Sequence, residues 1–486
     1  MKISRYETNF NKKIYFDETQ LKIKKYPKRY EEKIIKIYPK ILYQQIVGFG
    51  GAITEAAGYS FSKLSQEKHE NLIHDYFSKD GLNYTIARVP IGSCDFSLKP
   101  YSYTSKRNLS NFSIEKDKQY IIPMLQKAKS TEQNLSLFAS PWSPPWFMKN
   151  TRLQILGGKL RLKYRQAWAD YIVKFINAYK NEGLNVKYLT IQNEPNAIQI
   201  WESCLYSAKE EADFAINYLY PAFKNNNIDT KILIWDHNKD RIFDRATESF
   251  SLDGSNEAIS GIAYHYYSGD HFENLKLVRE NFPDKLLIHS EGCTGYSDFR
   301  PSDEIQNGEI YAHDILGDLN SGSNGYIDWN IFLDHQGGPN HKKNYCNSPC
   351  MLNDDSSDYI KNLTYYYIGH FSKFIKVDAK RIAFSKYTDR LELTAFKNPD
   401  DSIAIVILNK NDFNVEYNLC IEEKLINDTI ESHSIVTLEI GTVLFSTFKG
   451  LFYLKYLLIY GIIELRNIKP LRKGEGNDRK RKKRTD

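Results

Sequence analysis

The middle of the chain alternates short apolar runs with longer stretches of helical periodicity, and this alternation limits the fold more than any other feature. The runs are rich in β-branched and aromatic residues and are punctuated by Gly, Pro, Ser and Asn, as buried strands are. Eight of them occur: Ile46–Ile53, Tyr84–Ile91, Leu135–Ser143, Lys187–Pro195, Lys231–Asn238, Gly261–Tyr267, Lys285–Cys293 and Gly325–Leu333. Eight strands that alternate with helices over about 290 residues are what a (β/α)8 barrel requires, so the pattern predicts an α/β fold of this kind.

The stretches between these runs carry helix signals. Apolar residues recur near helical spacing in Leu160–Asn181, and Ser207–Asn225 opens with a serine that has Glu210 three residues later, as in a capping box. A doubly wound open sheet is the alternative, but it uses fewer strands and usually carries a G-x-G-x-x-G phosphate loop after the first. The sequence of Gly48–Gly51 does not match that loop, so the barrel is favoured.

The two ends of the chain have a different texture. After about Lys376, short segments alternate apolar and polar residues, and Ile14–Tyr43 alternates in the same way. The C-terminal segments are Leu391–Phe396, Ser402–Leu408, Asn414–Ile421 and His433–Ile440. This pattern predicts an accessory antiparallel β-sandwich formed by both chain ends beside the barrel. The predicted domains are residues 1–45 and 376–445 for the sandwich, 46–375 for the catalytic barrel and 446–486 for an apolar and then basic extension.

The formal charge of +6 does not describe the predicted domains. Residues 466–486 contain ten Lys or Arg and three Asp or Glu, which leaves −1 for residues 1–465. A basic tract confined to a tail does not indicate a nucleic-acid partner, and none is expected. Within the extension, Phe448–Leu465 is apolar but interrupted by two Lys and one Glu. This favours an interfacial amphipathic or disordered segment over a membrane span, and membrane association through it is the less favoured alternative.

Cysteine usage and the N-terminus indicate a compartment. Six cysteines in 486 residues are too sparse for a disulfide framework, and the first twenty residues contain no apolar stretch of the kind found in signal peptides. Both features predict a reduced, cytoplasmic protein.

Two glutamates stand at the ends of predicted barrel strands, where reactive side chains lie in this fold. The fourth run ends with Glu194 and the seventh with Glu291. A glutamate at the end of an apolar strand is costly to bury unless it is paired or useful. Retaining cleavage of a glycoside needs two carboxyl groups about 5–5.5 Å apart, one to protonate the departing oxygen and one to attack the anomeric carbon. A salt-bridged pair without catalytic function is the alternative.

Six blocks then stand in a specific order: Gly48–Ala56, Arg88–Ser97, Ala139–Trp146, Gln192–Pro195, His289–Gly292, and Asp328–Asn330 followed by Gly337–Asn340. They resemble those of the glucosylceramidase family of glycoside hydrolases, family 30. The resemblance covers roughly Gln45 to Ile440. It implies a (β/α)8 barrel with a side β-sandwich built from both chain ends, in agreement with the pattern of strands and helices.

The resemblance also implies roles for single residues. Glu194 would be the general acid/base and Glu291 the nucleophile, with Arg88 beside the nucleophile. Because the acid must be protonated in the resting enzyme, we expect a desolvated aromatic surround at Glu194, whereas the Arg88 cation would keep Glu291 ionised. Asn193 would donate to the sugar 2-OH, and Tyr267 would hydrogen-bond the nucleophile. No metal and no cofactor is required for this chemistry.

Four further residues match positions that bind the hydroxyls of the terminal sugar in the family: Asp95, Trp142, Trp329 and Asn344. Carboxylate and indole N–H groups bond hydroxyls, although core packing is the alternative for each tryptophan. His265 and Tyr266 precede Tyr267 in a run similar to the family's His-aromatic-Tyr run, so both are expected to support the site; a core histidine is the alternative for His265. Tyr266 replaces a Trp of the animal glucosylceramidases, so a preference for lipid aglycones is not implied.

The sequence thus predicts a retaining, exo-acting β-glycosidase whose substrate is a small β-glycoside or an oligosaccharide. β-Glucosides are favoured, and the resemblance extends the range to glycolipids of sphingolipid metabolism. β-Xylosidase, β-fucosidase and β-1,6-glucanase activities are alternatives, because the hydroxymethyl group that separates glucose from xylose is worth only about 1–3 kcal/mol in an apolar pocket. A non-catalytic sugar-binding protein is an alternative of another class, and the presence of both Glu194 and Glu291 argues against it.

Overall fold

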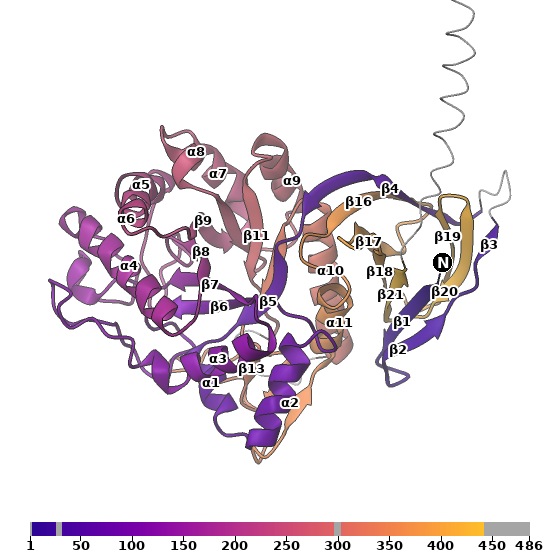
Figure 1. Ribbon diagram of the computed structural model, residues 1–486, viewed down its shortest axis with the longest axis horizontal. Coiled ribbons are helices and arrows are strands. Elements are labelled where there is room, and N and C mark those ends of the chain that lie inside the picture. Colours follow the sequence, from indigo (N-terminus) through magenta and orange to yellow (C-terminus); the bar gives the residue numbers. More distant parts are fainter. Residues whose placement is uncertain (1, 26–31, 296–302, 442–486) are drawn as a thin grey trace, which may run out of the picture. The chain divides into compact units, whose positions relative to one another are not determined.

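Eight parallel strands form a closed barrel in the computed structural model, which describes residues 2–25, 32–295 and 303–441 (Figure 1). The strands follow one another around the barrel in chain order, and the last pairs with the first. They are β5 (Gly48–Ala52), β6 (Ile86–Ile91), β7 (Ser136–Pro141), β8 (Val186–Thr190), β9 (Lys231–Asn238), β10 (Gly261–His265), β11 (Leu286–Glu291) and β12 (Gly325–Asp328). The predicted (β/α)8 barrel is confirmed, with one strand in each predicted run.

Side chains fill the centre of the barrel. Seven successive strands contribute one buried apolar residue each: Ile86, Phe138, Tyr188, Leu233, Ala263, Ile288 and Ile327. The remaining strand, β5, places Gly50 against its neighbour, where a Cβ atom would lie 1.9 Å from the backbone oxygen of Ile86. The interior is therefore a packed core, and a ligand site has to lie beyond the strand ends.

Helices follow the barrel strands along the chain and cover their outer faces (Figure 1). They are α1 (Glu55–Phe61), α2 (Gln66–Phe77), α3 (Ile121–Thr131), α4 (Arg165–Asn181), α5 (Ala208–Phe214), α6 (Tyr220–Asn225), α7 (Ile242–Phe250), α8 (Ser255–Ala258), α9 (Phe272–Asn281), α10 (Glu304–Asn320) and α11 (Leu363–Ser372). The capping box predicted before α5 is present, since Ser207 and Glu210 each accept the other's backbone N–H. A π-helical turn, Ala215–Leu219, joins α5 to α6.

Both ends of the chain enter one ten-stranded sheet, which confirms the predicted sandwich. Its strands are β1 (Ile3–Asn9), β2 (Ile14–Gln20), β3 (Lys24–Lys25), β4 (Ile34–Gln45), β16 (Lys380–Lys386), β17 (Glu392–Lys397), β18 (Ile403–Asn409), β19 (Val415–Ile421), β20 (Lys424–Ile430) and β21 (Ser434–Ile440). The order is β2-β1-β21-β18-β17-β16-β4-β19-β20-β3, and only β4 and β19 pair in parallel among these strands. The sheet folds over itself and brings together strands that are not neighbours in this order. Arg5 on β1, for example, forms an ion pair of 3.0 Å with Asp428 on β20.

Two barrel strands, β8 and β12, end five residues before the predicted runs do, a larger difference than at any other barrel strand. Asn193 and Glu194 lie in the loop beyond β8, and Glu194 has a left-handed backbone with φ of 49°. After β12 the chain leaves the barrel, and β13 (Phe332–Leu333) joins a small sheet with β14 (Cys350–Leu352) and β15 (Tyr359–Lys361). Both differences fall at the mouth of the barrel, where polar side chains interrupt the apolar pattern.

The barrel meets the sandwich through α10 and α11 (Figure 1). His370 of α11 lies with Nδ1 2.8 Å from Oγ1 of Thr437 on β21 and Nε2 2.9 Å from Oγ1 of Thr8 on β1. One side chain thus joins the barrel to both chain ends. No helix in the described ranges is long and apolar enough to cross a bilayer. The extension predicted at residues 446–486 lies outside the described residues.

Candidate active site

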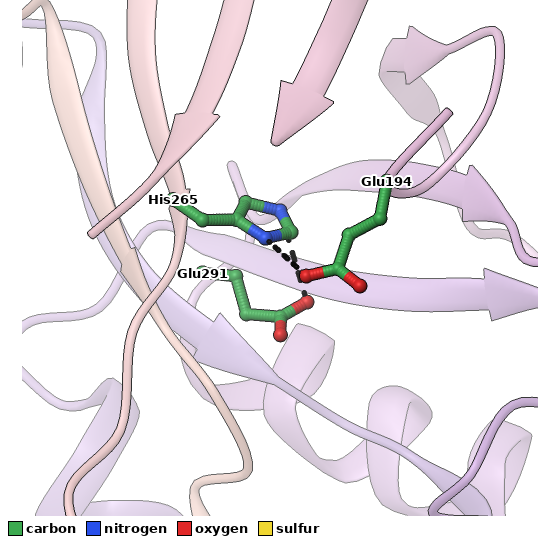
Figure 2. A group of neighbouring side chains, drawn as sticks. All are labelled: Glu194, His265 and Glu291. Carbon is green, nitrogen blue, oxygen red and sulfur yellow. Dashed lines mark hydrogen bonds and ion pairs between the residues drawn. The ribbon is translucent and has the colours of Figure 1, made fainter. Parts of the chain in front are cut away.

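Three titratable side chains meet where the barrel strands end (Figure 2). Glu194 follows β8, His265 is the last residue of β10 and Glu291 is the last residue of β11. The Nδ1 atom of His265 lies 3.4 Å from Oε1 of Glu194, and its Nε2 lies 3.8 Å from Oε2 of Glu291. A carboxyl oxygen of Glu194 lies within 4.8 Å of one of Glu291. The structure therefore brings together the two glutamates that the strand ends indicated.

Both carboxyl oxygens of Glu291 are held by neighbours. Arg88 on β6 donates from Nη1 to Oε2, and the Tyr267 hydroxyl donates to Oε1 at 3.1 Å. Arg88 is completely buried, which alone lowers its pKa, but Asp236 and Glu291 outweigh burial and raise it. The guanidinium therefore stays charged, and its hydrogen bond fixes the orientation of Glu291.

Asp236 at the mouth of β9 organises the site, and the sequence analysis did not identify it. It accepts hydrogen bonds from side chains of five strands: Arg88 (3.1 Å), Ser140 (2.7 Å), Thr190 (2.7 Å), His265 (3.1 Å) and Ser290 (2.5 Å). Burial raises the pKa of Asp236, but Arg88 and His265 lower it by a larger amount, so the carboxylate is ionised. The signal was present, since Asp236 is an acidic residue at a strand end like the two glutamates.

The protonation of the cluster differs from the prediction for Glu194. His265 is completely buried, which by itself lowers its pKa, yet Glu291, Asp236 and Glu194 together raise it to about 9. Burial likewise raises the pKa of Glu194, but the hydrogen bond from His265 and the nearby His237 lower it to about 2. The two histidines thus favour the ionised form of Glu194 in the free protein, whereas a protonated form was expected. An imidazolium favours the ionised form of a neighbouring carboxylate, so the proton of this pair lies on His265 in the free protein.

A cavity of about 350 Å³ opens beside the glutamates. It is lined by Asp95, Trp142, Asn193, Glu194, Gln199, Trp201, His237, Asn238, Tyr267 and Glu291. Six of these were predicted site residues, and Gln199, Trp201, His237 and Asn238 were not. His237 and Asn238 end β9 and share the signal of Asp236, whereas Gln199 and Trp201 lie in the loop after β8, where neither spacing nor periodicity marks them.

Asp95 lines the cavity and is hydrogen-bonded to Asn344. Asn344 donates from Nδ2 to Oδ2 of Asp95 at 2.6 Å. It is not among the residues that line the cavity, so its predicted contact with a sugar hydroxyl stays a prediction. Burial, together with Glu291 and Glu194, raises the pKa of Asp95 well above its usual range. A protonated carboxyl both donates and accepts, which suits the hydroxyl groups of a sugar.

The two predicted tryptophans lie on the cation. Trp142 and Trp329 stack with ring centroids 5.4 Å apart, and the guanidinium carbon of Arg88 lies 5.0 Å and 5.3 Å from their rings. Trp142 faces the cavity and Trp329 packs behind it. Arg88 also donates from Nη2 to Oδ1 of Asn193 at 2.8 Å, which leaves the amide NH₂ of Asn193 as the group able to donate to a ligand.

Tyr266 packs against Tyr267, with ring centroids 5.0 Å apart, and does not line the cavity beside the glutamates. Its hydroxyl donates to the backbone oxygen of Cys293 at 2.5 Å, and its ring lines a neighbouring cavity of about 450 Å³. Tyr267 lines both cavities. The supporting role of Tyr266 stays a prediction; its contacts are with the Cys293 backbone and with the ring of Tyr267.

Among the residues that the structure describes, two groups of three ligand-type side chains lie close enough to hold a cation. One is Glu194, His265 and Glu291; the other is His289, Asp314 and Asp318. In the second group the Lys239 ammonium already bonds both aspartates, at 3.0 Å to Asp318, so a cation is built into the fold there. In the first group the His265 imidazolium and the Arg88 guanidinium supply the positive charge.

A barrel that presents two facing carboxylates, a buried arginine and stacked tryptophans at its mouth has the site of a glycoside hydrolase. Residues 46–375 match the model of the glycosyl hydrolase family 30 TIM-barrel domain, and residues 378–438 match that of the family 30 β-sandwich domain. The chain belongs to this family.

Named relatives agree with the family. The chain is 35% identical over 403 residues to the lysosomal acid glucosylceramidase of Mus musculus, over 78% of this chain and 77% of the mouse protein. The crystal structure of SrfJ from Salmonella typhimurium matches 91% of this chain and 100% of that chain with a TM-score of 0.89 and 35% identity. An endo-β1,6-glucanase matches the same shares with a TM-score of 0.83 and 27% identity.

Proposed function

We propose that the protein is a retaining, exo-acting β-glycosidase that removes a terminal β-linked sugar, with β-glucosides as its substrates. The observation that carries the proposal is the pair Glu194 and Glu291, whose carboxyl oxygens approach within 4.8 Å. Retaining enzymes need about 5–5.5 Å, whereas an inverting enzyme needs about 6.5–9.5 Å to admit a water molecule between carboxylate and sugar.

The contacts of each glutamate support a division of roles. Glu291, fixed by Arg88 and Tyr267, attacks the anomeric carbon as the bond to the leaving oxygen breaks, and Glu194 gives that oxygen a proton. In the second step, Glu194 takes a proton from water, the water oxygen bonds to the anomeric carbon, and the ester bond to Glu291 breaks. The two displacements together retain the configuration of the sugar.

The proton that Glu194 gives away comes from the pair it forms with His265. In the free protein the imidazolium and the carboxylate lie 3.4 Å apart. Transfer of one proton from Nδ1 to Oε1 turns two charged groups into two neutral ones. A bound aglycone displaces water from this part of the cavity, and lower polarity favours the neutral pair. Substrate binding thereby converts Glu194 into the acid.

The cavity supports the exo mode and the choice of sugar. Its volume of about 350 Å³ is at the small end for ligand sites, which suits one terminal ring. Asp95 offers hydroxyl contacts, Trp142 covers C–H surface, and Asn193 has a free amide for the 2-OH. The mouse relative is named a glucosylceramidase and the structural neighbour an endo-β1,6-glucanase, and both names favour a β-linked glucose.

A panel of nitrophenyl β-glycosides tests the sugar, and NMR of the first-formed anomer tests the stereochemistry. We expect the highest kcat/KM on the β-glucoside, a first product with the β configuration, and stoichiometric labelling of Glu291 by a 2-deoxy-2-fluoro glucoside. A β-xyloside or β-fucoside preference would reassign the sugar, and turnover only of internal bonds in β-1,6-glucan would replace the exo mode. An α-configured first product would reject the retaining mechanism.

A further inference from the structure

Four residues of the active-site cavity have no part in the contacts assigned so far to the terminal sugar. They are Gln199 and Trp201 in the loop after β8, and His237 and Asn238 at the end of β9. All four are partly buried and line the cavity. Glu194 lies beside them, since Gln199 donates from Nε2 to its Oε2 at 3.3 Å and His237 is close enough to lower its pKa.

This position beside Glu194 is the aglycone side of the cavity. An acid has to lie within about 2.6–3.2 Å of the glycosidic oxygen to protonate it, and that oxygen is bonded to the first atom of the aglycone. Glu291 attacks the sugar from the opposite side of the bond that breaks. The Oε1 atom of Glu194 faces His265 at 3.4 Å (Figure 2), whereas Oε2 faces Gln199. The groups around Oε2 therefore meet the aglycone rather than the terminal sugar.

The imidazole of His237 is fixed as a hydrogen-bond donor. Its Nδ1 accepts the backbone N–H of Asn238 at 2.8 Å, and its ring stacks on Trp235 with centroids 5.0 Å apart. Burial lowers the pKa of His237 below its ordinary value, so the ring is neutral above about pH 7. A neutral imidazole that accepts at Nδ1 carries its hydrogen on Nε2. Nε2 forms no hydrogen bond with any residue that the structure describes, which leaves this N–H for a ligand.

The adjacent residue, Asn238, adds an amide without partners. Its side-chain oxygen is buried and accepts no hydrogen bond, and its NH₂ group donates none within the described ranges. A buried polar group left without a partner is rare and costly. Trp201 lines the same cavity, and an indole can cover the C–H face of a sugar ring. These groups together match a ring that carries hydroxyl groups, whereas an alkyl or acyl chain would leave the polar groups unpaired.

We infer that the aglycone is a second sugar residue, whose hydroxyl groups bond to His237, Asn238 and Gln199 beside Glu194. The inference rests on the proposed function, because an aglycone exists only if the chain cleaves a glycoside. It adds the substrate class, which is a glucosyl disaccharide or oligosaccharide rather than the glucoside of an alkyl alcohol.

Two β-glucosides of similar shape test the inference with the full-length chain. One is a β-1,6-linked glucosyl-glucose. The other is cyclohexylmethyl β-glucoside, whose leaving group is again a primary alcohol on a six-membered ring but carries no other hydroxyl group. The readout is the ratio of kcat/KM for the first substrate to that for the second. We expect a ratio of about 100 or more, since a site that bonds hydroxyl groups rejects an analogue without them. A ratio of one or below would overturn the inference.

Paired variants connect this ratio to the aglycone side. In His237→Phe/Asn238→Ala the ratio should fall at least about 20-fold. Both substrates need the same acid, so a change in Glu194 itself lowers both rates and does not produce this fall. His237→Gln, which places an N–H near the position of Nε2, should keep a higher ratio than His237→Phe. His74→Phe/Asn256→Ala makes the same exchanges at exposed positions of α2 and α8 and should keep the wild-type ratio. An unchanged ratio in His237→Phe/Asn238→Ala would overturn the inference.

Release of a trapped sugar provides a second measurement. A 2-deoxy-2-fluoro glucoside leaves its sugar on Glu291, and an added alcohol releases it. The alcohol oxygen bonds to the anomeric carbon, the ester bond to Glu291 breaks, and Glu194 takes the proton of the alcohol. Methyl β-glucoside should restore activity at least about tenfold faster than cyclohexylmethanol at equal concentration, and His237→Phe/Asn238→Ala should remove the difference. Equal rates in the wild type would overturn the inference, whereas the trapping itself would still support the proposed function. Absence of both trapping and turnover would reject the proposed function, and this inference with it.

Discussion

His265 and His370 are both completely buried, yet the protein holds them in opposite protonation states. His265 lies at the mouth of the barrel among three carboxylates, which raise its pKa to about 9. His370 lies where the barrel meets the sandwich, between the hydroxyl groups of Thr8 and Thr437. Burial, with Arg5 adding to the effect, lowers its pKa to about 3. Because both side chains are equally buried, the charge of their neighbours accounts for the difference in protonation.

The mouth of the barrel and the junction with the sandwich therefore have different roles, one in chemistry and one in stability. A buried cation among carboxylates is costly to assemble unless every partner is in place, so the mouth concentrates charge where chemistry uses it. At the junction, a neutral imidazole satisfies both ring nitrogens with hydroxyl groups and carries no net charge. Substitutions at the mouth should therefore alter turnover more than stability, and substitutions at the junction should do the reverse.

The largest expected effect is the loss of turnover in Glu291→Gln. Without the nucleophile, we expect kcat/KM on a nitrophenyl β-glucoside to fall by about 10⁴-fold or more, with the cooperative unfolding transition preserved. Arg88 retains Asp236 and Asn193 as partners in this variant. Glu257→Gln, an exposed residue of α8, is the control and should keep full activity. Covalent labelling of the variant by a fluorinated glucoside would show that the nucleophile is another residue.

Glu194→Gln should lose less and should lose it selectively. For a poor leaving group such as an alkyl alcohol, the absence of an acid should lower kcat/KM by about 10³-fold. For dinitrophenol, which leaves without protonation, the first step should be nearly unaffected and the glycosyl-enzyme should accumulate as a burst. Equal losses on both aglycones would contradict the roles assigned to Glu194 and Glu291.

At the junction, the protonation state of His370 should be measurable as a pH dependence of the unfolding free energy. Because the unfolded chain binds a proton at His370 near pH 6.5 and the folded chain does so only near pH 3, falling pH destabilises the fold. From pH 7 to pH 4.5 the wild type should lose about 2.5 kcal/mol more unfolding free energy than His370→Gln. Denaturant titrations at both pH values measure this, with the exposed His335→Gln as control. Parallel losses in wild type and His370→Gln would mean that His370 is charged.

Much of the fold could be predicted from the sequence, because the barrel strands are buried on both faces and appear as continuous apolar runs. Strands β1 and β16 lie outside the segments predicted as strands, and both carry polar residues for structural reasons. All residues of β1 but one are buried, yet its pattern is polar, since Arg5 pairs with Glu7 and Asp428 inside the sandwich. β16 is half exposed, so its alternation is weak.

The site could be predicted where the chemistry follows from position along the chain. Glu194 and Glu291 stand at strand ends, and that rule also covers Asp236, which was not among the predicted site residues. The protonation of Glu194 could not be read in this way, because it depends on His265, which is 71 residues away in sequence and 3.4 Å away in space. Electrostatic partners that belong to different strands become visible only when the barrel closes.

The smallest expected effect is the alkaline counterpart of the His370 experiment, at the mouth. His265 faces Glu194, Asp236 and Glu291 as well as the ring of Tyr267, and its raised pKa stabilises the fold fully below pH 6.5. That contribution is lost as pH rises through about 9.

From pH 7 to pH 8.5 the wild type should therefore lose about 1.7 kcal/mol more unfolding free energy than His265→Gln, whatever the variant's stability at neutral pH. The sign is opposite to that for His370, because here the folded chain binds the proton more tightly than the unfolded chain. Denaturant titrations across this range provide the measurement, and His335→Gln again serves as control. If the two curves ran parallel, His265 would be neutral in the folded protein, and the proton donated by Glu194 would have to come from solvent rather than from the imidazolium beside it.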